Sequence, residues 1–286
     1  MSCYDNREKY EKEKDMWEKW TNDEIYLLTK LYPTISNKSI SCYFPNRTYE
    51  SILWKAKDLG LKKTDEQYRK SRKNNQIYSI NENYFNEYSH NMFYVLGFIS
   101  ADGCVTSTNG KNKCVSIHTK KEDKKILEKI KNDMKSNHKI YEYEKSVKLC
   151  IGNNQLYNSL QNFGITERKS LTFHFPNIPT EFQSDFIRGY FDGDGTVSKN
   201  HYSVKILGTK QFLEMLAEIL SKQNIKIHSI YEANPNKQNS SHLTFALLIT
   251  RKNECEKFAK YIYKNNGIYL ERKYDRFYAQ TEQSKD

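Results

Sequence analysis

Two aspartates, Asp102 and Asp194, hold the same place in two copies of one motif. The copies are VLGFISADGCV at 95–105 and IRGYFDGDGTV at 187–197, and in each a glycine follows the aspartate. Two matching segments indicate two copies of one supersecondary unit. Carboxylates that converge can hold a divalent cation, which can activate water for hydrolysis of a phosphodiester bond. The sequence therefore predicts a two-carboxylate metal site, with Mg²⁺ as the expected ion and Mn²⁺ as its substitute.

The residues before each aspartate are predicted to form a helix. Small residues lie four apart in both copies, Gly97 with Ala101 and Gly189 with Gly193, so they share one helical face. Glycine inside a helix costs about 0.5–1 kcal/mol relative to alanine, so its use here indicates two backbones in close approach. We expect the two helices to pack through this face and to bring the aspartates side by side. The alternative is a symmetric domain without catalysis, in which both aspartates only cap helix ends.

The sequence after each motif repeats one order of predicted elements. A strand is predicted at 113–119 and 202–207 and a helix at 124–134 and 210–220, followed in each copy by further strands, another helix and a basic segment. The predicted fold class is α+β, with two pseudo-symmetric αββαββα halves at residues 85–180 and 181–286.

The motif pair resembles the dodecapeptides of LAGLIDADG homing endonucleases, and the similarity spans roughly residues 90–280. The resemblance implies a site-specific endonuclease that cuts both strands of DNA and initiates mobility of an intron or of its own gene. It implies that the carbonyls of Ala101 and Gly193 are further metal ligands. It also implies a catalytic-centre lysine in each closing segment, Lys169 in ERKS and Lys273 in ERKY. The flanking Arg168 and Arg272 are competing candidates, and each lysine could instead be a surface residue in a basic run.

The family's strands form a curved saddle over the major groove, so outward-facing positions on the predicted strands are candidate DNA contacts. Alternation places Val115 and Ile117 in the core and their neighbours outside. The candidates are Ser116, His118, Tyr141, Tyr143, Lys148, His201, Ser203, Lys205, His242 and Thr244.

A separate helical unit is predicted at residues 17–62. Thr21 and Glu24 form a capping box at the first helix, a second helix fits 37–43, and a third begins at Thr48 and ends at Gly60. With Trp20 and Trp54 as large core residues, this unit resembles Myb/SANT-like helix-turn-helix modules. The resemblance implies that the third helix contacts DNA, through Arg47, Tyr49, Glu50, Lys55 and Lys57. The alternative is a protein-interaction domain with a solvated basic face.

Composition indicates a polyanionic partner. Lys and Arg number 46 against 35 Asp and Glu, which favours nucleic acid over an anionic membrane surface. Residues 1–16 are expected to be a disordered tail and residues 63–84 a basic linker. No apolar run is long enough for a membrane helix, and the charged N-terminus lacks a signal peptide. We therefore expect a location inside the cell, in the cytoplasm, the nucleoid or an organelle matrix. We also expect the protein to be a monomer. An intein is not expected, because position 1 is neither Cys nor Ser and the chain ends in TEQSKD.

Two other functions remain open on the same scaffold. The first is an RNA maturase that binds structured intron RNA through its basic surface. The second is a DNA-binding regulator that does not cut. Neither needs both carboxylates, so the presence of Asp102 and Asp194 favours the endonuclease.

Overall fold

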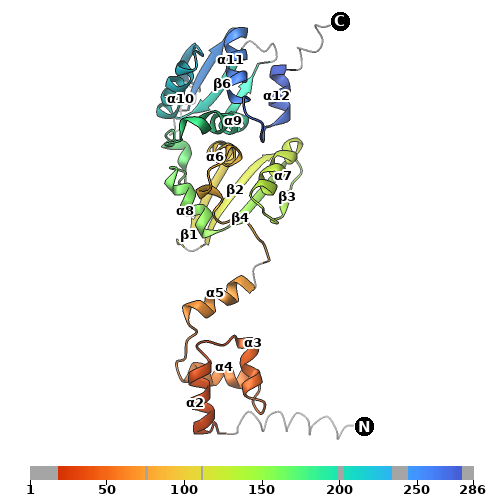
Figure 1. Ribbon diagram of the computed structural model, residues 1–286, viewed down its shortest axis with the longest axis vertical. Coiled ribbons are helices and arrows are strands. Elements are labelled where there is room, and N and C mark those ends of the chain that lie inside the picture. The colour runs from red at the N-terminus through yellow and green to blue at the C-terminus, as the bar shows by residue number, and fades with distance from the viewer. Residues whose placement is uncertain (1–18, 75–76, 111, 199–202, 234–243, 279–286) are drawn as a thin grey trace, which may run out of the picture. The chain divides into compact units, whose positions relative to one another are not determined.

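The computed structural model describes residues 19–74, 77–110, 112–198, 203–233 and 244–278 (Figure 1). The chain forms two compact units, unit 1 at residues 1–77 and unit 2 at residues 78–286. The predicted tail at 1–16 lies outside the described residues, as do His201 and His242. Within the described ranges, no helix is long and apolar enough to cross a membrane.

Unit 1 is a small helical bundle. It contains α2 (Asn22–Leu31), α3 (Asn37–Ile40), the 3₁₀ turn η1 (Ser41–Tyr43) and α4 (Tyr49–Asp58). The predicted capping box is confirmed, because the Thr21 hydroxyl accepts from the Glu24 N–H while the Glu24 carboxylate accepts from the Thr21 N–H. The buried core consists of Leu28, Ile40, Phe44, Ile52 and Ala56.

One expectation for unit 1 is wrong, and the segment after it contains a helix. Trp54 is not a core residue, because its side chain is 70% exposed. It lies two residues from both Ile52 and Ala56, which puts it on the opposite face of α4 from these buried side chains. The expected linker at 63–84 contains a helix, α5 (Asp65–Asn74), which begins where the Thr64 hydroxyl accepts from the Gln67 N–H.

Unit 2 contains two antiparallel sheets with the same strand order. The first has the order β1-β2-β4-β3, formed by β1 (Gly103–Thr108), β2 (Asn112–Lys120), β4 (Ser146–Gly152) and β3 (Ile140–Glu142). The second has the order β5-β6-β8-β7, formed by β5 (Gly195–Val197), β6 (Ser203–Gly208), β8 (Phe245–Thr250) and β7 (Ser229–Glu232). The predicted α+β fold with two copies of one unit is therefore confirmed.

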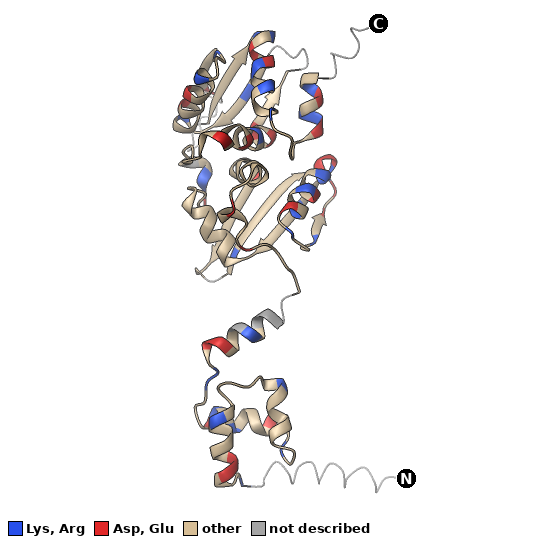
Figure 2. Ribbon diagram, in the orientation of Figure 1, with Lys and Arg blue, Asp and Glu red and all other residues tan. Residues whose placement is uncertain are grey.

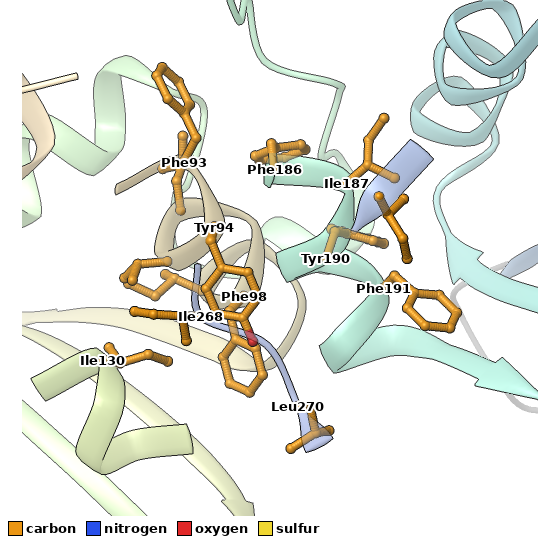
Figure 3. Packing of buried hydrophobic residues seen from close by; sticks show 14 of the residues in the cluster. Phe93, Tyr94, Phe98, Ile130, Phe186, Ile187, Tyr190, Phe191, Ile268 and Leu270 are labelled. Carbon is orange, nitrogen blue, oxygen red and sulfur yellow. The ribbon is translucent and has the colours of Figure 1, made fainter. Parts of the chain in front are cut away.

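Two long helices join the halves. Helices α6 (His90–Asp102) and α9 (Gln183–Asp194) lie side by side between the two sheets (Figure 1). Every residue from Met92 to Ser100 and from Ser184 to Asp192 is buried, because each helix is covered by the other helix and by its own sheet. Figure 3 shows side chains of α6, α9 and residues 268–270 gathered in one core, so the two halves form a single compact unit.

Shorter helices complete each half. The first half contains η2 (Tyr84–Asn86), η3 (Lys121–Asp123), α7 (Lys124–Asp133), α8 (Asn154–Asn162) and η4 (Lys169–Leu171). The second contains η5 (Thr180–Phe182), α10 (Lys210–Lys222), α11 (Lys252–Ile262) and α12 (Glu271–Tyr278). The predicted basic closing segments correspond to η4 and α12, which bring Lys169 and Lys273 back to the ends of α6 and α9.

Candidate metal centre and nucleic-acid interface

Glycines set the distance between α6 and α9. A Cβ on Gly97 would lie 2.1 Å from the Phe186 carbonyl oxygen, and a Cβ on Gly189 would lie 1.9 Å from the Tyr94 carbonyl oxygen. Nearer the helix ends, a Cβ on Gly193 would lie 2.3 Å from the Ala101 Cβ. The backbones therefore touch along the small-residue face that the sequence marks, which aligns the last turns of both helices.

Asp102 and Asp194 are the last residues of these two helices. Both side chains are half-buried, and no side-chain or backbone donor in the described part of the chain reaches either carboxylate. Burial, together with the charge of Asp102, raises the pKa of Asp194 to about 6. Burial also raises the pKa of Asp102, against the lowering effect of Lys273 and Lys169. Neighbouring carboxylates without donors fit a divalent cation, which would supply the missing positive charge.

The site depends on these two carboxylates. Neither here nor elsewhere in the described ranges do three or more His, Cys, Asp or Glu side chains form a group that could hold a metal ion. Further ligands must then be backbone oxygens or water, as is usual for Mg²⁺. The carbonyls of Ala101 and Gly193 stand next to the carboxylates in the chain, and each already accepts a long hydrogen bond from a lysine, of 3.4 and 3.2 Å. A carbonyl oxygen has a second lone pair, so these bonds leave both carbonyls able to act as ligands.

Each closing segment contributes a buried lysine to the end of one helix. The Nζ of Lys169 donates to the Gly103 carbonyl at 2.7 Å, and the Nζ of Lys273 donates to the Phe191 and Asp192 carbonyls at 2.8 and 2.6 Å. Burial lowers the pKa of Lys169 and lowers that of Lys273 to about 8. The alternative that these lysines are surface residues is wrong, because their side chains are 8% and 5% exposed. They put positive charge at the negative ends of two helix dipoles, beside the carboxylates.

Sequence reasoning missed an ion pair at the edge of this site. Arg272 of the second half donates to the carboxylate of Asp123 of the first half at 2.8 Å, and both residues line a cavity of about 330 Å³ together with Asp102 and Gly193. The only sequence signal is an acidic residue just before α7, where the second half has Thr209 before α10.

The outer faces of the sheets carry the candidate DNA contacts. Val115 and Ile117 are buried as predicted, while Ser116 is half-buried and His118 is exposed on the other face of β2. The remaining described candidates are exposed or half-buried, and they are Tyr141, Tyr143, Lys148, Ser203, Lys205 and Thr244. In Figure 2 the strands are mostly tan and the charged residues gather on the outer helices. These faces therefore carry scattered hydroxyl, imidazole and amine groups rather than a continuous charged surface.

In unit 1 the candidates divide into exposed and buried residues. Tyr49, Glu50 and Lys57 are exposed, whereas Lys55 is half-buried and pairs with Asp58 at 2.9 Å. The fifth candidate, Arg47, is only 9% exposed. Its Nε donates to Glu24 at 2.9 Å, and its Nη2 donates to Glu24 at 2.8 Å and to the Lys19 carbonyl at 3.1 Å. Arg47 therefore stabilises the fold of unit 1 and is not presented to a ligand, which corrects its prediction as a DNA contact.

Comparison with known proteins gives three kinds of match. Over 189 residues the chain is 27% identical to the probable translation initiation factor IF-2 of Methanocaldococcus jannaschii, and the match covers 64% of this chain but 15% of that protein. Similar solved structures include mesophilic variants of the homing endonuclease I-DmoI, with 18% identity, a TM-score of 0.47 and coverage of 65% of this chain and 98% of that one. Full-length DUF199/WhiA from Thermatoga maritima matches with 16% identity, a TM-score of 0.44 and coverage of 72% and 66%. Residues 181–263, in the second half of unit 2, match the family model of the LAGLIDADG-like domain.

Proposed function

We propose that this chain is a site-specific DNA endonuclease that hydrolyses phosphodiester bonds in both strands with a divalent metal held by Asp102 and Asp194. The observation that carries the proposal is the pair of donor-free carboxylates at the ends of two helices in backbone contact. The LAGLIDADG-like domain at residues 181–263 supports it, because this domain contains one of the two carboxylates. Intron homing by a monomer, with Mg²⁺ as the ion and Mn²⁺ as its substitute, is part of the same proposal.

The roles of the chain's own residues follow from their contacts. Asp102 and Asp194 would hold the cation, with the carbonyls of Ala101 and Gly193 beside them. The bound metal would supply an activated water and neutralise the leaving 3′-oxygen. Lys169 and Lys273, fixed to the helix-end carbonyls, would stabilise the negative charge that develops on the phosphate. Since burial lowers the pKa of Lys273 to about 8, this lysine keeps its proton at neutral pH.

DNA binding in this proposal uses both units. The net charge of +11 favours a polyanion, and the outer faces of the two sheets provide polar groups for contact with the grooves. In unit 1 the exposed Tyr49 and Lys57 on α4, together with the half-buried Lys55, would add contacts outside the cleavage site. Removal of unit 1 should then weaken DNA binding more than it weakens catalysis.

The test is cleavage of DNA by the full chain. We would incubate the protein with a plasmid library of randomised and native flanking DNA, with Mg²⁺ or with EDTA, and sequence the cut ends. Defined double-strand ends are expected with Mg²⁺ alone. Asp102→Asn and Asp194→Asn should abolish cutting and leave DNA affinity within about threefold, whereas the control Asp65→Asn on exposed α5 should cut normally.

Other outcomes select the other functions. Cleavage that survives in Asp102→Asn or Asp194→Asn would overturn the metal assignment. DNA binding without cutting by the wild-type protein would favour the regulator. Preference for structured intron RNA over duplex DNA would favour the maturase, whose recognition relies on RNA shape and 2′-hydroxyl groups.

A further inference from the structure

One arginine reaches from the second half of unit 2 to the first. Arg272 on α12 forms a charge-assisted fork with Asp123 on η3: its Nε donates to Oδ1 at 2.8 Å and to Oδ2 at 3.1 Å, and its Nη2 donates to Oδ2 at 2.8 Å. The side chain of Asp123 is 4% exposed, so the carboxylate is fixed. The side chain of Arg272 is 44% exposed, so part of the guanidinium faces solvent.

The fork leaves one edge of the guanidinium unused. A guanidinium has five N–H donors, and Asp123 occupies only the edge formed by Nε and Nη2. No other acceptor in the described ranges takes a hydrogen bond from Arg272. The edge formed by Nη1 and the second Nη2 proton remains, and this planar pair of donors matches two oxygens of a phosphate.

This side chain lines a cavity that also borders the metal site. The cavity has a volume of about 330 Å³, and its lining includes Asp102 and Gly193 from the ends of α6 and α9. The other lining residues are His118, Thr119, Lys120, Asp123, Lys145 and Ser146. Arg272 compensates the charge of Asp123, and Lys120 lies 3.7 Å from the carboxylate of Glu122. Lys145 adds a further positive charge to the lining, next to the carboxylate of Asp102, which a bound metal would neutralise. The chemistry of the cavity therefore suits an anion.

Among the described residues, the second half has no equivalent arrangement. The place of Asp123 before α7 is taken by Thr209 before α10, and the Thr209 hydroxyl donates to the Phe173 carbonyl. The place of Arg272 is taken by Arg168, which is exposed and has a φ of 60°. In the described part of the chain no carboxylate accepts a hydrogen bond from Arg168, so it lacks the positioning contact that Asp123 gives to Arg272.

We propose that Arg272 binds a backbone phosphate of DNA in the cavity beside Asp102, in the first half only, and that Asp123 is its positioning residue. This inference rests on the proposed function in one respect, since it takes double-stranded DNA as the ligand. The phosphate would be a neighbour of the one that is cut, because the cavity adjoins the carboxylate pair without containing both members. The two strands would then be held unequally.

A purely structural role is the competing explanation. Lys129 also contacts α12, with its Nζ donating to Glu271 at 3.1 Å, so the fork between Arg272 and Asp123 could be a second strut between the halves. A strut and a phosphate site differ in one measurable property. Each phosphate that a protein neutralises releases counterions, which makes log K against log salt steeper by about 0.9 on duplex DNA. A strut has no such effect.

The experiment measures binding of the full-length protein to a random-sequence 30-bp duplex by fluorescence anisotropy, in EDTA, at salt concentrations from about 50 to 200 mM. Arg272→Gln should make the slope shallower by about one and weaken binding about tenfold at the lower salt. Arg272→Lys should keep the slope but lose about three- to tenfold in affinity, because a lysine cannot make the bidentate contact. Asp123→Asn should likewise keep the slope and lose affinity. Arg168→Gln, the matched control, should bind like the wild type.

Thermal unfolding of each variant separates the explanations. An unchanged slope in folded Arg272→Gln overturns the inference, as does a loss of melting temperature in Arg272→Gln and Asp123→Asn without any change in binding. If Arg272→Gln does not fold, wild-type affinity in Arg272→Lys overturns it instead. A slope change in Arg168→Gln as large as in Arg272→Gln overturns the restriction to one half. This binding experiment is done in EDTA and therefore does not depend on cleavage. A protein that binds DNA but does not cut it in Mg²⁺ would contradict the proposed function and leave the result for Arg272 unaffected.

Discussion

The hydroxyl of Tyr94 on α6 donates to the carboxylate of Asp192 on α9 at 2.8 Å, inside the interface between the two halves. Both side chains are buried, and the second contact of the carboxylate is the N–H of Leu270 at 2.7 Å. At the equivalent places of the other half stand Phe186 and Ser100, whose hydroxyl donates to a carbonyl of its own helix. The difference between the two motifs therefore lies in the core and leaves Asp102 and Asp194 matched.

Tyr94→Phe should destabilise unit 2 by about 1–3 kcal/mol, because it removes a donor from a buried carboxylate. Burial already raises the pKa of Asp192 to about 6, so keeping this carboxylate ionised costs the folded state free energy. The double variant Tyr94→Phe with Asp192→Ser copies the other half and should recover part of the loss. Urea unfolding followed by far-UV circular dichroism measures this. The control is Tyr190→Phe, whose hydroxyl donates to the Leu207 carbonyl at 3.0 Å, and an equal loss in it would show that the charge of Asp192 does not matter.

Local patterns predicted the elements that carry the site. The glycines at Gly97 and Gly189 predicted helix contact correctly, because a missing Cβ has a direct steric meaning that survives in any context. Alternation predicted the buried face of β2, and the capping box predicted the start of α2. The repeat then doubled each of these signals, since a pattern found twice in register is hard to produce by chance.

Contacts between distant segments were not predictable in the same way. Arg47 looks like a DNA contact on a basic helix start, and only the fold shows that Glu24 of another helix takes its guanidinium. Trp54 is the largest side chain on α4, yet it is exposed, because the smaller Ile52 and Ala56 face the core from the opposite side of the helix. The fork between Arg272 and Asp123 links two halves that the sequence describes separately. Such pairings depend on tertiary geometry, and a local sequence pattern does not identify the two partners.

Gly189→Ala should destabilise unit 2 strongly, by about 2–4 kcal/mol, despite the better helix propensity of alanine. The new Cβ would lie 1.9 Å from the Tyr94 carbonyl oxygen and 2.9 Å from the Phe98 nitrogen, and both are backbone atoms that cannot move alone. The melting temperature and the rate of DNA cleavage should both fall, because the new Cβ forces the two helices apart. Gly152→Ala is the control: a Cβ there meets nothing within 4 Å, so its melting temperature should match the wild type. A stable Gly189→Ala protein would contradict the close packing of α6 and α9.

The ion pair of Glu24 with Arg47 predicts how the stability of unit 1 depends on pH. The hydrogen bonds from Arg47 lower the pKa of Glu24 from 4.5 to about 2, so the contribution of the pair is present above pH 4.5 and is lost as the pH falls towards 2. Because the Glu24 side chain is 25% exposed, we expect about 1–2 kcal/mol at pH 7. Residues 78–286 contain no tryptophan, and Trp20 packs against the core of unit 1, so tryptophan fluorescence follows the unfolding of unit 1.

Glu24→Gln should therefore lower the urea midpoint of the fluorescence transition at pH 7, and the difference from the wild type should shrink as the pH approaches 2. Asp58→Asn is the control, because Asp58 pairs with Lys55 at the surface and its side chain is 67% exposed. This control should change the midpoint little at any pH. A gap between Glu24→Gln and the wild type that stays constant down to low pH would mean that packing, rather than charge, accounts for the effect.

Asp194→Asn should stabilise the protein in the absence of metal. Burial and the neighbouring Asp102 raise the pKa of Asp194 from 3.8 to about 6, so at pH 8 the folded state holds an unfavourable charge that the unfolded state exposes to water. The asparagine removes this charge, and the gain should be on the order of 1–3 kcal/mol. Since the folded wild type takes up a proton as the pH falls from 6 towards 4, the gain should disappear over that range.

Metal should reverse this order, which separates a metal site from an unfavourable charge without function. If the cation binds only the folded wild type, the melting temperature of the wild type should rise with the concentration of the cation. Asp194→Asn lacks one ligand, so its melting temperature should rise less. The measurement is thermal unfolding of both proteins at pH 8 with EDTA and with increasing Mg²⁺, with Asp275→Asn on the exposed face of α12 as the control. Equal responses of wild type and Asp194→Asn to Mg²⁺ would show that the ion binds elsewhere. If the variant is more stable in EDTA and the wild type gains more from Mg²⁺, the cost of keeping two carboxylates together is explained by the ion that they hold.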